Sequence, residues 1–230
     1  KKFNETQMLE ALYTATYTDD VYTVILDEMN LSRVEYYFAD FLSILEYPVD
    51  KWKLKIMQLP YQFDAPMHLE DGILQIPSNT WFIGTANKDD STYTITDKVY
   101  DRAITINFDD RNEEFKVTQE VKPIKLSYNG LRVLFRNALA IKENALNTED
   151  KRKFKIITDF IYETFDLTFG NRINKQIRDY VPCYIACGGT EIEAVDFIVA
   201  KKVLRKFESL SLGFMKDELT KFNGYLDKLF

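Results

Sequence analysis

Two adjacent carboxylates, Asp27 and Glu28, directly follow the apolar run at residues 23–26. In open parallel sheets, ligands gather beyond the carboxyl ends of the strands. An aspartate at such a position can hold Mg²⁺, directly or through water, while an adjacent glutamate orients and polarises an attacking water. The pair therefore predicts a site for phosphate chemistry. The alternative is an ordinary strand end, because an apolar run followed by Asp-Glu also occurs where a strand leads into a capped helix.

Asn87 follows a second apolar run, at residues 80–85. An asparagine at the same sheet edge could position the lytic water or contact a γ-phosphate. The alternative is a turn residue, because residues 87–91 have the composition of a turn.

Arg102 lies just before a third apolar run, at residues 103–108. An arginine at the rim of a domain can complete a neighbouring subunit's site as a finger that stabilises the transferred phosphate. The alternative is a surface salt bridge with Asp97 or Asp101.

The elements that must position these residues form an α/β pattern. The three apolar runs are continuous rather than alternating, which favours strands of a sheet covered by helices on both faces. Between the first two runs, apolar residues recur with helical spacing over residues 34–45, and Ser32 with Glu35 predicts a capping box at the start of that helix. Strand, helix and strand in this order indicate a βαβ unit of a parallel sheet. Residues 47–78 are expected to hold a hairpin, with arms at 53–59 and 72–76.

The second half of the chain is predicted to be helical. Apolar stripes of period 3.6 indicate three helices, and Thr190 with Glu193 predicts a second capping box. The stripes consist of Leu131, Leu134, Phe135 and Ala138; of Phe154, Ile157, Ile161 and Phe165; and of Phe197, Ala200, Leu204 and Phe207. We therefore expect two domains, an α/β core at 1–121 and an all-helical domain at 122–230.

Composition excludes several classes of protein. The 230 residues carry a formal net charge of −6, which gives no broad attraction to nucleic-acid phosphates. One histidine and two cysteines cannot supply a histidine-centred triad or a complete zinc site. No apolar run is long enough to span a membrane, and residues 1–5 do not resemble a signal peptide, so a cytoplasmic protein is expected.

Taken in order, these motifs resemble the AAA+ ATPases of the McrB/MoxR, dynein-related branch. Residues 24–30 (VILDEMN) look like the Walker B strand of that branch, and residues 76–87 (IPSNTWFIGTAN) are similar to its sensor 1 strand. Residues 99–102 (VYDR) match the place of its arginine finger. The resemblance covers the first half at the level of motifs, whereas the helical half is similar only in general plan to the lid domain of the family.

The resemblance implies roles for individual residues in a ring-forming ATPase that remodels a macromolecular partner. Asp27 would help to hold Mg²⁺, directly or through water, and Glu28 would activate water. Asn87 would sense the γ-phosphate of ATP, or of GTP, and Arg102 would reach into the neighbouring subunit. In the lid, Arg172 is expected to be the sensor 2 residue, with Arg178 as its rival.

One departure from the family pattern is large. The phosphate loop GxxxxGK[ST] does not occur, since none of the eight glycines is followed by lysine. We therefore expect the chain to be the C-terminal two-thirds of a AAA+ module that binds nucleotide poorly or not at all by itself. The alternative is a non-catalytic regulatory or assembly module of a AAA+-like or restriction-type complex, with an unidentified protein or nucleic-acid partner.

Overall fold

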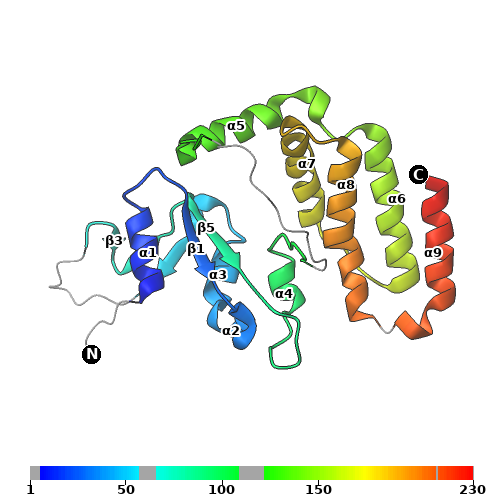
Figure 1. Cartoon of the computed structure of the whole chain (residues 1–230), viewed down its shortest axis with the longest axis horizontal. Coiled ribbons are helices and arrows are strands. Elements are labelled where there is room, and N and C mark those ends of the chain that lie inside the picture. The colour runs from blue at the N-terminus through cyan, green and yellow to red at the C-terminus, as the bar shows by residue number, and fades with distance from the viewer. Residues whose placement is uncertain (1–5, 57–65, 109–121, 211, 230) are drawn as a thin grey trace. The chain divides into compact units, whose positions relative to one another are not determined.

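The computed structural model is a mixed α/β protein with more helix than strand (Figure 1). It describes residues 6–56, 66–108, 122–210 and 212–229. The chain divides into two compact units, Lys1–Leu131 and Arg132–Phe230. The division falls inside α5 (Tyr128–Ala140), whereas the sequence suggested a boundary after residue 121.

The first unit contains a two-stranded parallel sheet made of β1 (Tyr22–Leu26) and β5 (Thr80–Gly84). The register places Val24 opposite Phe82 and Leu26 opposite Gly84, so both strands end at the same edge. The predicted parallel pairing of the first two apolar runs is confirmed.

The helix predicted between these strands is interrupted. It consists of α2 (Val34–Tyr37) and α3 (Ala39–Ile44), separated at Phe38, whose φ of −106° and ψ of 12° leave the helical range. The predicted capping box at Ser32 is wrong, because the N-cap position of α2 is Arg33, one residue later, and no side chain caps the helix there. Four residues of the apolar stripe, Val34, Phe38, Phe41 and Leu42, are nevertheless buried, whereas Tyr37 is exposed. Phe38 and Phe41 pack against Phe82 of the sheet.

Only one face of the parallel sheet is buried at its centre. Val24 and Phe82 point into the core, whereas Ile25, Trp81 and Ile83 on the other face are 64%, 41% and 50% exposed. The expected cover of helices on both faces is therefore wrong at these positions in the part of the chain that is described. The third apolar run was also predicted to be a strand, but residues 103–108 form no helix or strand.

A second, antiparallel sheet lies in the same unit. β4 (Ile73–Gln75) pairs antiparallel with β2 (Lys53–Lys55), which confirms the pairing of the two predicted arms where they are described; residues 57–65 lie outside the described residues. β4 also pairs with β3 (Leu69–Glu70), which directly precedes it in the chain and was not predicted. Leu74 and Ile76 are fully buried with Leu12 of α1 (Gln7–Ala15). The remaining short elements of this unit are η1 (Met29–Leu31), η2 (Val49–Lys51) and α4 (Asp97–Tyr100).

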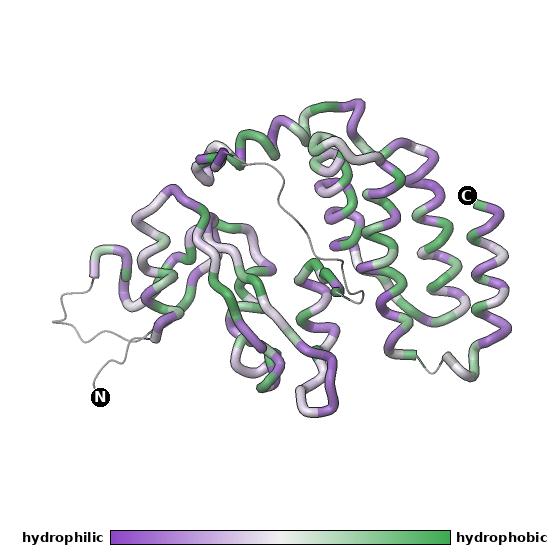
Figure 2. Tube along the Cα trace, in the orientation of Figure 1, coloured by the Kyte–Doolittle hydropathy of each residue, from purple (hydrophilic) through white to green (hydrophobic). Residues whose placement is uncertain are grey.

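The second unit is all helical in its described residues. Its elements are the end of α5, η3 (Lys142–Asn144), α6 (Thr148–Phe165), α7 (Asn171–Ala186), α8 (Glu191–Ile198), η4 (Val199–Val203), η5 (Leu204–Ser209), η6 (Leu212–Phe214) and α9 (Lys216–Leu229). Hydrophobic and hydrophilic stretches alternate along these helices, as expected for helices that share one core (Figure 2).

The three predicted helical stripes meet different outcomes. The helix of the first stripe forms as α5, but the stripe is wrong at Leu134 and Phe135, which are exposed, and only Ala138 is buried. All four apolar residues of the α6 stripe are buried, with Ile157 and Ile161 almost inaccessible.

Of the stripe predicted after Thr190, Phe207 is buried and Phe197 and Leu204 pack against the core while partly exposed, whereas Ala200 is exposed and the prediction is wrong there. The regular helix ends at Ile198 and η4 is a π-helical turn, whose wider turn changes the register after Ile198, so that Val203 is buried rather than Ala200.

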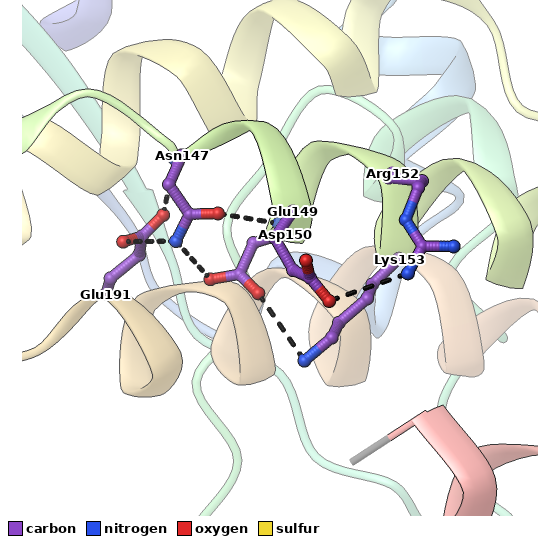
Figure 3. Close-up of polar contacts among 6 residues, drawn as sticks. All are labelled: Asn147, Glu149, Asp150, Arg152, Lys153 and Glu191. Atoms are coloured by element: carbon purple, nitrogen blue, oxygen red, sulfur yellow. Dashed lines mark hydrogen bonds and ion pairs between the residues drawn. The ribbon is translucent and has the colours of Figure 1, made fainter.

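The starts of α6 and α8 are tied together by polar contacts (Figure 3). Asn147 caps α6 by accepting from the Asp150 amide at 2.8 Å, and both its backbone and side-chain nitrogens donate to the Glu191 carboxylate. The predicted capping box at the start of α8 is confirmed, with Thr190 and Glu193 bonded reciprocally. Among the described helices, none has the length and apolar character that crossing a bilayer requires.

Candidate functional site at the ends of β1 and β5

The two parallel strands bring their following residues together at one edge of the sheet. The Thr85 amide donates to the Leu26 carbonyl at 3.0 Å, and the Met29 amide donates to the Thr85 carbonyl at 2.8 Å. Gly84 leaves room for the Met29 side chain at this edge, because a Cβ there would lie 2.2 Å from the Met29 sulfur. The geometry thus places Asp27, which follows β1, beside Thr85, which follows β5.

A chain of hydrogen bonds joins the two strand ends. The Thr85 hydroxyl donates to Asp27 Oδ1 at 2.6 Å and accepts from the Glu28 amide at 2.8 Å. Both carboxylate residues are exposed. Two adjacent carboxylate residues are therefore exposed to solvent, and the Thr85 hydroxyl holds them in place.

Glu28 has an unusual backbone conformation. Its φ of 48° and ψ of 43° lie in the left-handed region, which costs a residue with a Cβ roughly 1–2 kcal/mol. The bond from its amide to Thr85 offsets part of that cost. Strain of this kind collects at functional sites, where it sets the direction in which a side chain leaves the backbone.

Asn30 fixes the loop that follows β5. It is only 4% exposed, and its side-chain amide donates to the carbonyls of Asn87 at 2.8 Å and Tyr93 at 3.2 Å. The Tyr93 amide in turn donates to the Asn30 carbonyl at 2.9 Å. Asn30 therefore connects the segment after β1 to both ends of the loop that begins at Asn87.

The loop itself is a turn, as its composition predicted. The Ser91 amide and hydroxyl both donate to Asp89 Oδ1, at 3.0 and 2.6 Å, and these bonds lower the pKa of the Asp89 carboxyl. The carbonyl of Asn87 also accepts from the Thr92 hydroxyl at 2.9 Å. The Asn87 side chain is exposed, on the loop that starts from the same rim as Asp27.

These residues fit a magnesium ion that arrives with a phosphate ligand. Mg²⁺ is commonly bound through one or two carboxylates, with waters and phosphate oxygens completing six ligands. Asp27 uses Oδ1 to accept from Thr85, and a carboxylate has further lone pairs for a metal or its water. Within the described residues, no group of three or more His, Cys, Asp or Glu could hold an ion by itself. The rim therefore does not fit a metal bound by protein ligands alone.

Arg102 is bonded within its own chain. Its guanidinium donates to the Glu46 carboxylate, to the Lys98 carbonyl and, at 2.9 Å, to the Leu42 carbonyl. The sequence alternative was a salt bridge of Arg102 with Asp97 or Asp101. The structure shows a salt bridge with Glu46, in the segment after α3. The role of Arg102 as a finger in a neighbouring subunit stays a prediction.

Arg172 and Arg178 both lie on α7 of the second unit. Arg172 is in the first turn, and the Arg178 guanidinium donates to the Asn174 carbonyl at 3.1 Å. The choice between them as sensor 2 stays open.

Sequence reasoning did not identify Thr85 or Asn30 as site residues. Thr85 was counted as the end of an apolar run, although a hydroxyl at the end of a strand beside Asp27 could have suggested a bond. Asn30 directly follows the carboxylate segment, and its type gave no sign that it would be buried. Comparison of the chain with protein-family models, with curated proteins and with solved structures found no match.

Proposed function

We propose that the rim formed by Asp27, Glu28 and Asn87 is the hydrolytic side of a nucleoside-triphosphate site in a ring-forming AAA+ ATPase of the McrB/MoxR branch. The phosphate loop would come from residues other than these 230, because the chain contains no GxxxxGK[ST] sequence. By itself the chain would bind nucleotide poorly or not at all.

The observation that carries the proposal is the parallel pairing of β1 with β5 at a shared edge, with Leu26 opposite Gly84. This pairing puts a carboxylate pair and an asparagine-containing loop beyond the carboxyl ends of neighbouring parallel strands, where open α/β sheets bind their ligands. The hydrogen bond between Thr85 and Asp27 ties the two strand ends together. The motif order and the spatial neighbourhood thus favour the same site.

Each residue has a distinct task in this proposal. Mg²⁺, when bound, neutralises charge on the phosphate oxygens. Asp27 orients that ion, directly or through water, and Glu28 accepts a proton from the attacking water. As the water oxygen bonds to the γ-phosphorus, the bond to the β–γ bridging oxygen breaks and the diphosphate leaves. Asn87 contacts the γ-phosphate or the water.

Two arginines would act from outside the rim. As a finger, Arg102 would exchange its bond with Glu46 for a phosphate of the neighbouring subunit's nucleotide. Head-to-tail contacts of this kind close into rings when the rotation permits. Arg172 would report the nucleotide to the helical unit, with Arg178 as its rival.

The experiment compares the full-length protein with its Glu28→Gln and Glu10→Gln variants. Glu10 is an exposed residue of α1 and serves as the matched control. Glu28→Gln is expected to retain Mg-ATP binding and to lower turnover about 10²–10⁴-fold, the usual contribution of a general base. Unchanged turnover in Glu28→Gln would remove Glu28 from the mechanism, and no turnover in the wild type would refute the ATPase.

A second candidate function is a non-catalytic assembly module, and the exposed apolar face of the parallel sheet favours it. Ile25, Trp81 and Ile83 form an apolar patch of the kind that marks interaction surfaces. Under this alternative, the wild-type protein would neither bind nor hydrolyse nucleotide. Ile83→Lys would then weaken assembly with the partner, whereas Glu28→Gln would leave assembly unchanged.

A further inference from the structure

We propose that Thr85 is the positioning residue of this rim: its hydroxyl aims the Asp27 carboxylate at the metal and holds the backbone of Glu28. The inference rests on the proposed function, because it assigns Thr85 a part in the same nucleotide site. Thr85 itself touches neither nucleotide nor metal in this assignment.

Counting protons fixes the direction of the hydrogen bonds. A threonine hydroxyl has one proton and two lone pairs, and an ionised carboxylate can only accept. The Thr85 proton therefore goes to Asp27 Oδ1, at 2.6 Å, and the amide of Glu28 donates to a lone pair of the Thr85 hydroxyl oxygen, at 2.8 Å. The three groups form one directed chain, from amide to hydroxyl to carboxylate.

This chain leaves a defined part of Asp27 for a metal. With Oδ1 accepting from Thr85, rotation of the carboxylate is restricted, and a carboxylate still has its second oxygen and further lone pairs to offer a metal. Hydrogen-bonded partners of this kind orient metal-binding carboxylates, and their loss typically costs 10–100-fold in metal affinity or activity.

The same hydroxyl also supports the left-handed backbone of Glu28. If the hydroxyl is lost, the Glu28 amide loses its acceptor while the residue keeps its unfavourable φ of 48°. One side chain thus controls both carboxylate residues, one through its carboxyl group and the other through its backbone.

The test uses three variants of the full-length protein. Thr85→Val has almost the same shape as threonine but no hydroxyl, and Thr85→Ser retains the hydroxyl. Thr23→Val makes the same chemical change at an exposed position of β1 and serves as the control. For each protein, ATP turnover is measured against Mg²⁺ concentration at a fixed, saturating amount of ATP.

Thr85→Val is expected to raise the Mg²⁺ concentration for half-maximal turnover about 10–100-fold. Thr85→Ser and Thr23→Val should remain close to the wild type. A Thr85→Val protein with a lower melting temperature but an unchanged Mg²⁺ requirement would overturn the proposal, because Thr85 would then be only structural. Absence of turnover in the wild type would instead refute the proposed function, and this inference with it.

A second measurement tests the geometry without any nucleotide. In the 230-residue chain, hydrogen exchange of the Glu28 amide is followed by NMR. Thr85→Val should accelerate that exchange about tenfold relative to Thr85→Ser, the size expected from losing one net hydrogen bond. Equal exchange in the two variants would show that the hydroxyl does not hold the Glu28 backbone.

Discussion

Replacing Asn30 by aspartate tests how strongly the two loops of the rim depend on one buried amide. The Asn30 side chain donates to the carbonyls of Asn87 and Tyr93 at 2.8 and 3.2 Å. Asn30→Asp keeps the shape but replaces the donor by an oxygen that faces two carbonyl oxygens. Losing two net hydrogen bonds costs about 2 kcal/mol, and burying an acceptor or a charge against the carbonyls brings the expected total to about 3–5 kcal/mol at pH 7.

The free energy of unfolding that Asn30→Asp loses should increase as the pH rises. Burial and the facing carbonyls raise the pKa of the introduced carboxyl above its unfolded value of about 3.9. The folded state then binds the proton more tightly than the unfolded state, so the variant is least destabilised below about pH 3.9. Its destabilisation grows as the pH rises through that value towards the folded pKa.

Tryptophan fluorescence during urea unfolding reports the first unit selectively, because Trp52 and Trp81 are the only tryptophans and both belong to that unit. Asn107→Asp adds the same charge at an exposed position of the unit and should change its free energy of unfolding little. Equal losses in Asn30→Asp and Asn107→Asp, or a cost of Asn30→Asp that stays constant between pH 4 and pH 7, would refute the reasoning.

Two further predictions concern other parts of the chain. Gly84→Ala should lower the free energy of unfolding of the first unit by about 1 kcal/mol, since its methyl would displace the flexible Met29 side chain. In urea unfolding, Gly84→Ala should cost less free energy of unfolding when it is made in a Met29→Ala protein. An equal cost in both backgrounds would contradict the clash. In the second unit, bonds from Thr190 lower the pKa of the Glu193 carboxyl. The capping box should therefore contribute stability above the unfolded pKa of about 4.3 and lose it as the pH falls through the lower folded pKa. Helical circular dichroism during thermal unfolding at pH 7 and pH 3 should accordingly show less acid dependence in Glu193→Gln than in the wild type, and equal dependence would exclude this contribution.

The sequence predicted those parts of the fold that depend on strong local patterns. The β-rich runs at 23–26 and 80–85 pair in parallel, as the order strand, helix, strand predicted. The capping box of Thr190 and Glu193 forms because it depends on two residue types at a short fixed spacing. Periodicity failed where the backbone departs from a regular helix. The break at Phe38 divides the predicted helix although most of its stripe stays buried, and the π-helical turn η4 changes the register after Ile198; apolar spacing carries no sign of either.

The sequence predicted the residues of the candidate site, but not the hydrogen bonds and backbone conformation that hold them in place. Asp27, Glu28 and Asn87 were selected by type and by their place after apolar runs, and the structure brings the segments that carry them to one edge. The bond from Thr85 to Asp27 joins residues 58 positions apart, so only the strand register reveals it. The left-handed conformation of Glu28 was equally unpredictable, because glutamate has no preference for that region.

The most direct test of the central claim is cleavage of the full-length protein by Fe²⁺ bound in place of Mg²⁺ together with ATP. Added hydrogen peroxide oxidises the bound Fe²⁺ and yields hydroxyl radicals that cut the nearby backbone, and ascorbate reduces the iron again. The account predicts nucleotide-dependent cuts in two segments, near Asp27 and near Thr85, and the loss of both cuts in Asp27→Asn. Cuts confined to other parts of the protein, or unchanged by Asp27→Asn, would contradict a metal–nucleotide site at the ends of β1 and β5.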